Sequence, residues 1–354
     1  MAMGTGTKAP TLYDVAALAG VSHQTVARLL RGEGNIRPKT QERIHAAVSE
    51  LGYRRNVTAR NLRNGRTDAI VLAIPDLRQP YFAELAQSAV TAAQRVGLTV
   101  LIETTDGDPA RELAVLEGAR SQIADGVILS PKSIGEAELR RLKVPIPVVL
   151  FGDRVMDSAF DHVTLPNVEG TRRAVEHLIG SGRRRIAFIG AEEPGSGGAA
   201  ALRLDGYESA LREAGLPVDE SLVVPDGEWV RGSGQLSMAR LLDSGVAFDA
   251  VFCCNDALAI GALRTMLSRG IRVPEDIAIV GFDDTEDARY TFPSLTSVSP
   301  GREQLANEAV QLLHRRINHD VGAEAPVDLV SDFELVVRES SLAKSPSDEF
   351  TAVA

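Results

Sequence analysis

The stretch Thr11-Leu-Tyr-Asp-Val-Ala-Ala-Leu-Ala-Gly-Val-Ser-His-Gln-Thr-Val-Ala-Arg28 has the pattern of two short helices separated by Gly20. Thr11 is a good N-cap residue, and Asp14 places an acid in the first turn of the first helix. The apolar residues that follow recur at helical spacing. Gly20 tolerates the positive φ that ends a helix, and Ser22 can cap the next one. The stretch therefore predicts a compact pair of helices.

The second predicted helix has an apolar side and a polar side. Its inward-facing positions are Val26, Leu29 and Leu30, and the opposite side holds His23, Gln24, Ala27 and Arg28. A helix pair with such a free polar face is typical of a helix-turn-helix, whose second helix enters the major groove of DNA. A helical hairpin with a solvated face has the same pattern. The charge distribution is needed to decide between the two.

The charge of the chain is unevenly divided. Residues 1–66 hold 11 Lys and Arg against 4 Asp and Glu, a net charge of +7, whereas the remaining residues hold 27 against 44, a net charge of −17. The overall net charge of −10 therefore conceals a basic head on an acidic body. Five arginines end this head: Arg54, Arg55, Arg60, Arg63 and Arg66. A basic segment beside a helix pair favours nucleic-acid binding through phosphate contacts.

From Ala69 onward, short apolar runs alternate with helical stretches, and the series restarts after residues 162–165. The runs are 69–74, 98–102, 126–129 and 148–151, followed by 186–189, 222–224, 250–253 and 277–280. Continuous apolar runs indicate parallel strands covered on both faces. The predicted fold class is therefore an all-α helix-turn-helix head on a two-lobed α/β body of two doubly wound parallel sheets. That body resembles periplasmic sugar-binding proteins.

Several function classes are disfavoured by what the sequence lacks. No run approaches the roughly 18 apolar residues that span a bilayer, and the N-terminus has no apolar signal region, so we expect a cytoplasmic protein without membrane contact. Cys253 and Cys254 are adjacent and are interpreted as small buried residues. Neither metal-ligand spacing nor a dinucleotide-binding glycine motif is found. We therefore expect no metal, no cofactor and no enzymatic activity.

Polar and aromatic residues follow the predicted strands, where ligands bind in such folds. They are Asp76, Phe82, Arg203, Trp229, Asn255-Asp256 and Asp283-Asp284. Carboxylate, amide and guanidinium groups can bind adjacent hydroxyls, and aromatic rings can cover apolar sugar faces. Helix capping is the alternative. Capping explains Asp256 and Asp284 better, whereas the residues alone leave both explanations open for Asn255, Asp283 and Arg203.

Six motifs carry a family resemblance: Leu12-Tyr-Asp-Val-Ala16, Gly20-Val-Ser-x-x-Thr-Val-x-Arg28, Leu51-Gly-Tyr53, Ala59-Arg-Asn-Leu62, Cys254-Asn-Asp-Ala-Leu-Ala-Ile-Gly261 and Val280-Gly-Phe-Asp-Asp284. With them the chain resembles the LacI/GalR family of transcriptional repressors from residue 11 to about residue 340. The resemblance implies a homodimer whose recognition helices enter successive major grooves of a pseudo-palindromic operator. It also implies a small-molecule effector, a sugar or nucleoside, in the cleft between the lobes, and a linker that becomes helical only on DNA.

The resemblance implies a set of DNA-contacting residues: Ser22, His23, Gln24, Thr25, Arg28, Tyr53, Asn56, Ala59, Arg60 and Leu62. His23, Gln24 and Arg28 would reach base edges, where Gln24 suits adenine and Arg28 suits guanine, each through two hydrogen bonds. Ser22, Thr25 and Asn56 would contact phosphates, and Tyr53 would support the hinge. Leu62 matches the leucine that wedges into the minor groove at the operator centre.

A second set of residues is implied for the effector: Asp76, Phe82, Asp153, Arg203, Trp229, Asn255 and Asp283. The segment Phe151-Gly-Asp-Arg154 is one residue longer than the usual pattern, so either Gly152 or Asp153 occupies the binding position. The resemblance favours a repressor of carbohydrate-utilisation genes that is switched by a sugar-like molecule. The alternative is a solute-binding protein of the exported type without a regulatory role, which the basic head and the absent export signal oppose.

The domain boundaries follow from these patterns. We expect a helix-turn-helix domain over 1–56 with 1–10 disordered, a hinge over 57–67, a body over 68–342 and a flexible tail over 343–354. The first lobe would comprise 68–164 and 297–326, and the second 165–294 and 328–340. The tail holds no leucine heptads, so we expect a dimer without a tetramerising coiled coil.

Substitution of Leu62 tests the wedge. Leu62→Ala is expected to weaken specific operator binding much more than non-specific binding, because an apolar wedge stabilises only the kinked operator centre. Competition gel shifts with operator and random duplexes measure both affinities. Equal losses on the two duplexes would contradict the wedge.

Overall fold

The computed structural model describes residues 10–30, 36–53, 66–117, 123–142, 144–155, 158–192, 197–318 and 325–342. The chain divides into two compact units, Met1–Arg66 and Thr67–Ala354, called here the head and the body. The predictions for residues 1–9, for Asn56, Ala59, Arg60 and Leu62, and for the tail 343–354 lie outside the described residues.

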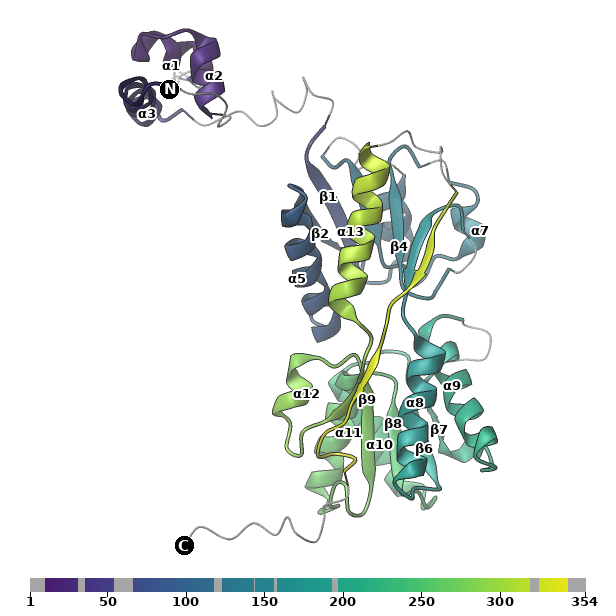
Figure 1. The fold of residues 1–354 in the computed structure, drawn as a ribbon. Helices are drawn as coiled ribbons and strands as arrows, with labels where there is room; N and C mark the ends of the chain where they lie inside the picture. Colours follow the sequence, from purple (N-terminus) through teal and green to yellow (C-terminus); the bar gives the residue numbers. More distant parts are fainter. Residues whose placement is uncertain are drawn as a thin grey trace, which may run out of the picture. The chain divides into compact units, whose positions relative to one another are not determined.

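The head contains the expected helices (Figure 1), which are α1 (Leu12–Ala19), α2 (His23–Leu30) and α3 (Pro38–Leu51). Their shared core is small and is formed by Val15, Ala16, Ala19, Val26, Ile44 and Ala47. These positions face inward because they recur at helical spacing on each helix. The third helix covers the first two, so the pair has one face against a core and one face left for solvent.

The turn between α1 and α2 is held from several sides. Thr11 and Asp14 form a reciprocal capping box at the start of α1. Gly20 has a φ of +59° and ends α1 in the left-handed conformation that glycine favours. The guanidinium of Arg43 on α3 donates to the carbonyl oxygens of Ala19 and Gly20. The third helix therefore fixes the angle at which α2 leaves the turn.

The first sheet of the body has the strand order β11-β5-β4-β3-β1-β2, and all its pairings are parallel. Its strands are β1 (Ala69–Ile74), β2 (Thr99–Thr104), β3 (Gly126–Leu129), β4 (Val148–Phe151), β5 (Asp161–Thr164) and β11 (Asp328–Val330). Its helices are α5 (Pro80–Arg95), α6 (Pro109–Leu116), α7 (Glu136–Leu139) and α13 (Arg302–Asn318). In β1, Ile70 and Leu72 pack in one core cluster and Val71 and Ala73 in the other. Both faces are covered, which explains the unbroken apolar run.

The second sheet has the order β12-β10-β9-β8-β6-β7, with β12 antiparallel to β10. Its strands are β6 (Ile186–Ala191), β7 (Val223–Pro225), β8 (Ala250–Cys253), β9 (Ala278–Phe282), β10 (Thr296–Ser299) and β12 (Glu334–Val336). Its helices are α8 (Asn167–Gly180), α9 (Ala199–Glu213), α10 (Arg231–Asp243), α11 (Asp256–Ser268) and α12 (Glu286–Tyr290), with a 3₁₀ turn at Glu220–Leu222. The predicted fold class, a helical head and a body of two doubly wound sheets, is confirmed.

Two crossings between the lobes differ from the expected boundaries. Strand β10 belongs to the second sheet, although 297 was expected to begin the return to the first lobe, and β11 belongs to the first sheet, although 328 was expected in the second lobe. The boundary at 297 was misplaced because β10 carries hydroxyl side chains. Ser297 donates to Asp256 and Thr296 bonds to Ser341, so these residues are buried without an apolar run.

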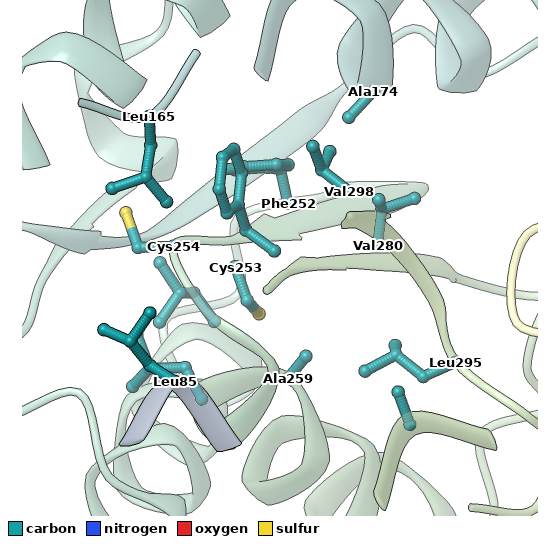
Figure 2. Packing of buried hydrophobic residues seen from close by; sticks show 14 of the residues in the cluster. Leu85, Leu165, Ala174, Phe252, Cys253, Cys254, Ala259, Val280, Leu295 and Val298 are labelled. Atoms are coloured by element: carbon teal, nitrogen blue, oxygen red, sulfur yellow. The ribbon is translucent and has the colours of Figure 1, made fainter. Parts of the chain in front are cut away.

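Cys253 and Cys254 are both buried and unpaired, as expected for small core residues. Figure 2 shows them among aliphatic and aromatic side chains, including Phe252 and Val280 of the second lobe and Leu85 of the first. Burial raises the pKa of both thiols. In the described part of the chain, no helix is both long and apolar enough to cross a membrane, and no cluster of His, Cys, Asp and Glu could hold a metal ion.

Helices α10 and α11 approach each other at two glycines. A Cβ built on Gly261 would lie 2.0 Å from the carbonyl oxygen of Arg231, and one on Gly234 would lie 2.3 Å from that of Leu258. Both obstacles are backbone atoms, which cannot rotate away as a side chain does. The close crossing therefore requires glycine at these positions.

Gly261→Ala is expected to destabilise the body by about 1–3 kcal/mol, because the added methyl group forces α10 and α11 apart. Urea unfolding followed by circular dichroism measures the loss. Gly232→Ala is the matched control, since a Cβ there meets nothing within 4 Å. That change should be neutral or stabilising by up to about 1 kcal/mol. Equal stability of the two variants would show that a methyl group at position 261 fits between α10 and α11.

Candidate functional site

The body contains a cavity of about 180 Å³ whose wall comes from both lobes. Residues at the carboxyl ends of the parallel strands supply most of its polar groups. Ser130 follows β3 and Asp153 follows β4 in the first lobe, and Asn255 follows β8 and Asp283 follows β9 in the second. This is the position at which doubly wound folds bind ligands.

Six of the seven predicted effector residues line this cavity: Phe82, Asp153, Arg203, Trp229, Asn255 and Asp283. Gly152 lines it as well, so the two candidates of the Phe151–Arg154 segment share the same wall. Asp76 is not among the lining residues. Its carboxylate pairs with Arg78 two residues later, at 2.9 Å, and this partner lowers the pKa of Asp76.

Asp153 is the most deeply buried acid of the first-lobe wall, with 7% of its surface exposed. Its Oδ1 accepts a hydrogen bond from the hydroxyl of Thr164. Its Oδ2 is buried and has no partner among the described residues. Burial raises the pKa of Asp153 despite the opposing effects of Thr164 and Arg203. A buried, unpaired oxygen beside a cavity is a ready partner for a ligand hydroxyl.

Arg203 projects from α9 and is 3% exposed. Its Nε donates to Oδ1 of Asn167 at 2.7 Å, and its Nη1 donates to the carbonyl oxygen of Cys254. The guanidinium carbon lies 3.6 Å from the ring centre of Phe282 and 5.2 Å from that of Trp229. These aromatic contacts stabilise the cation where water is excluded. The group is thus held in one orientation before any ligand binds.

Trp229 and Asn255 are joined by a hydrogen bond, and each makes a further hydrogen bond to the backbone. Nδ2 of Asn255 donates to the backbone carbonyl of Trp229 at 3.0 Å, and Oδ1 of Asn255 caps α11 by accepting from the N–H of Leu258 at 2.8 Å. The indole N–H of Trp229 donates to the carbonyl of Gly190 at 3.0 Å. Asn255 therefore combines the capping role with a place in the cavity wall, so the two explanations left open for it are compatible.

Asp283 faces the cavity from the end of β9. Burial raises its pKa to about 7, Arg203 and Arg302 oppose this shift, and Glu84 adds to it. Arg302 donates to the backbone carbonyl of Asp283 at 2.9 Å and pairs with Glu84 on α5 at 2.5 Å. Glu84 also accepts the backbone N–H of Glu286 at the start of α12, at 2.9 Å. The cavity wall is thus linked to a contact between the lobes.

The cavity also has an aromatic wall and a charged rim. Tyr81 and Phe82 pack edge to face with their ring centres 5.2 Å apart. Burial raises the pKa of Tyr81, so its hydroxyl stays neutral. Lys132, Arg154, Glu192 and Glu228 also line the cavity. The arrangement offers hydrogen bonds at its centre and ring faces beside them, which suits a polyhydroxylated ring.

Some lining residues were not predicted. Ser130 and Lys132 follow β3, so the strand-end rule that identified Asn255 could have found them. The buried carboxylate of Glu112 holds their loop by accepting the backbone N–H groups of Lys132 and Ile134 at 2.8 and 2.9 Å. Asp256 and Asp284 do not line the cavity. The capping role expected for them is wrong, because the side chain of Asn255 caps α11 and Thr285 is the N-cap residue of α12. Asp256 accepts from Thr285 and Ser297, and Asp284 pairs with Arg338.

The head presents the polar face that the sequence predicted. Ser22, His23, Gln24 and Arg28 are exposed on or beside α2, and Thr25 is half-buried. The Ser22 hydroxyl accepts the backbone N–H of Thr25 at 3.2 Å and caps the helix. Tyr53 packs against the head core. Gln24 and Arg28 therefore lie on the exposed side of α2 that faces away from Val26. The ring of His23 lies beside that of Tyr13, with their centres 4.9 Å apart.

Comparisons with known proteins agree with both parts of this description. Residues 11–56 match the model of bacterial regulatory proteins of the lacI family, and residues 175–341 match a periplasmic binding protein-like domain. The transcriptional regulator CelR of Thermobifida fusca is 36% identical over 349 residues, which cover 94% of this chain and 98% of that protein.

Solved structures give the same result. The structure of a CelR–cellobiose complex is 34% identical, covers 94% of this chain and 99% of that one, and has a TM-score of 0.69. The lac repressor dimer bound to operator and an anti-inducer is 27% identical, covers 95% of this chain and 100% of that one, and has a TM-score of 0.79. These relatives are transcriptional regulators and not enzymes. The chain belongs to the LacI family of DNA-binding transcriptional regulators with a periplasmic-binding-protein-like ligand-binding body.

Proposed function

We propose that this protein is a sugar-responsive repressor of carbohydrate-utilisation genes that binds a pseudo-palindromic operator as a homodimer. One observation carries the proposal: the body holds a cavity in which Asp153 of the first lobe and Arg203 and Asp283 of the second face the same space. A ligand that contacts all three residues changes how the two lobes are arranged relative to each other. A regulator needs such a change in order to respond to its ligand. The similarity to CelR, solved with cellobiose, supports a sugar as that ligand.

In this proposal, His23, Gln24 and Arg28 on α2 reach base edges. Gln24 and Arg28 are exposed and lie one helical turn apart on α2. Ser22 and Thr25 contact phosphates from the N-terminal end of the helix, where its dipole favours an anion. Tyr53 supports the linker, and Asn56, Ala59, Arg60 and Leu62 contact the minor groove or its backbone. The net charge of +7 on residues 1–66 supports the phosphate contacts.

A dimer would cover an apolar surface of the body. Leu101 and Ile102 are 37% and 43% exposed on β2, which is an edge strand of the first sheet. Tyr290 and Phe292 are 79% and 86% exposed at the end of α12. Large apolar side chains on one molecule favour contact with another. The hydrogen bond from Glu286 to Glu84 joins α12 to α5, the helix that precedes β2. The similarity to the dimeric lac repressor also supports this arrangement.

The switch follows from the groups that connect the cavity to the lobe contact. A sugar hydroxyl bound to Asp283 changes the charge that Arg302 experiences, and Arg302 holds Glu84 of the first lobe. The ligand shifts the balance between two lobe arrangements only by its difference in affinity for them. A coupling of about 1–3 kcal/mol would change operator affinity roughly 5–150-fold.

The DNA-binding part of the proposal is tested by selecting the operator from genomic fragments. Gln24→Ala is expected to reduce discrimination between this operator and its single-base variants by about 1–3 kcal/mol at one base pair in each half-site, because two hydrogen bonds to a base are lost. Fluorescence anisotropy at fixed salt measures it.

Gln235→Ala is the matched control for that test, since Gln235 is an exposed glutamine on α10 of the body. The control should bind as the unaltered protein does. The DNA-binding proposal is wrong if no fragment is preferred over calf-thymus DNA at moderate salt. If Gln24→Ala discriminates between the operator and its single-base variants as well as the unaltered protein does, Gln24 does not contact a base edge.

Sugar binding is expected to depend on the ionisation of Asp283. Hydroxyl donors favour the ionised carboxylate, and the pKa of Asp283 is raised to about 7. Affinity for cellobiose should therefore rise by up to about tenfold between pH 6 and pH 8, as measured by isothermal titration calorimetry. Asp283→Asn should flatten this dependence. Asp205→Asn, an exposed change on the helix that carries Arg203, should keep it. A flat profile for the unaltered protein would contradict the role of Asp283.

A further inference from the structure

Trp229, an aromatic residue of the cavity wall, has an unusual backbone conformation. Its φ is +54°, in the left-handed region, which is a genuine outlier for a bulky side chain. Such a conformation persists only where the surrounding structure fixes it, and it is found preferentially at functional sites. The groups that hold Trp229 in this conformation therefore also shape the cavity.

The peptide groups on both sides of Trp229 are held by side chains. After Trp229, its carbonyl oxygen accepts from Nδ2 of Asn255 at 3.0 Å, and the N–H of Val230 donates to Oγ of Ser233 at 3.2 Å. Before Trp229, its own N–H donates to Oδ1 of Asp226 at 3.4 Å. Because peptide groups are planar, only the φ and ψ rotations of Trp229 lie between these held groups. Asp226 thus holds the side of the turn that Asn255 and Ser233 do not reach.

Asp226 is itself firmly placed. It directly follows β7, is 8% exposed, and its N–H donates to the carbonyl of Ala191 at the end of β6 at 2.8 Å. Its Oδ1 also accepts the backbone N–H of Glu228 at 3.2 Å. Its Oδ2 accepts from the hydroxyl of Ser237 on α10 at 2.9 Å. One carboxylate oxygen therefore holds the turn, and the other holds α10.

The held backbone fixes where the indole lies. The indole N–H donates to the carbonyl of Gly190 at 3.0 Å, and the ring centre lies 5.2 Å from the guanidinium carbon of Arg203. Trp229 lines the cavity, whereas Asp226 is not among the described residues that line it. A ring that is already oriented does not have to be ordered by the ligand, which favours binding.

We propose that Asp226 is a positioning residue for effector binding, which holds Trp229 in its left-handed conformation and so sets the aromatic wall of the cavity before the ligand arrives. The inference rests on the proposed function and adds a role for a residue outside the cavity wall. Without the acceptor oxygen, Trp229 would relax to an ordinary negative φ, and the ligand would have to restore the turn.

Tryptophan fluorescence tests the positioning without a ligand. Trp229 is the only tryptophan of the chain, so the signal of the full-length protein reports on this residue alone. In Asp226→Ala, emission is expected at longer wavelength and acrylamide should quench it more strongly, because the released ring is more exposed to water. Asp226→Leu fills the volume without an acceptor and gives the same test if the alanine variant does not fold. Unchanged emission and quenching in a folded variant without the acceptor would overturn the proposal.

Two matched variants separate positioning from general structural damage. Asp226→Asn keeps an acceptor oxygen for the turn, and Ser237→Ala removes the bond to α10 while leaving Oδ1 of Asp226 on the turn. Both should show the emission and quenching of the unaltered protein. If either variant reproduces the change seen in Asp226→Ala, the bonds from Oδ1 to the turn are not what holds Trp229, and the proposal is wrong.

Calorimetry with cellobiose measures the consequence for binding. Asp226→Ala should weaken binding by roughly tenfold, because fewer molecules hold the ring in place before the ligand binds. The same change should have little further effect in the Trp229→Gly background, where no indole is left to position and a positive φ carries no strain. Equal losses in the two backgrounds would show that Asp226 does not act through Trp229.

The two proposals fail in different ways. If the unaltered protein binds neither cellobiose nor any other sugar, the proposed effector is wrong, and the ligand-free fluorescence still decides whether Asp226 holds Trp229. If sugar binds and the fluorescence of Asp226→Ala is unchanged, the effector site stands and the positioning role is wrong.

Discussion

The burial of Arg203 at the junction of the two lobes is the constraint on which the site depends. A guanidinium without water needs several partners, and here they come from the crossing segment, from the end of β8 and from two aromatic rings. Satisfying the cation in this way fixes its orientation. It also leaves Oδ2 of Asp153 and the carboxylate of Asp283 facing the same cavity. The ligand-binding geometry is thus a consequence of how a buried charge is accommodated.

The same cavity wall is connected to the contact between the lobes. Arg302 binds the backbone of Asp283 and the side chain of Glu84, and Glu84 also binds the start of α12. These elements adjoin the exposed apolar residues of β2 and α12, the proposed dimer surface. A short chain of contacts therefore connects the cavity to the proposed dimer surface. The head has a core of its own, formed by residues of its three helices.

The sequence predicted the apolar strands well because both faces of each inner strand are covered, which leaves an unbroken run of apolar residues. It did not predict β10, since Thr296 and Ser297 are buried through hydrogen bonds rather than apolar contacts. The search for polar residues that follow the strands identified most of the predicted residues that line the cavity. Asp76 does not line the cavity because it pairs with the neighbouring Arg78. The hydrogen bond between Asn167 and Arg203 could not be predicted because the two residues are 36 positions apart along the chain. The linker residues lie outside the described part, so their roles remain predictions from resemblance.

We propose that binding of a small molecule in the cavity is coupled to binding of an operator by the head. The decisive measurement is the full cycle of binding constants for full-length protein, cellobiose and the selected operator. Saturating cellobiose should change operator affinity by some factor, and saturating operator should change cellobiose affinity by the same factor. Cellobiose that binds tightly while operator affinity stays unchanged would contradict it.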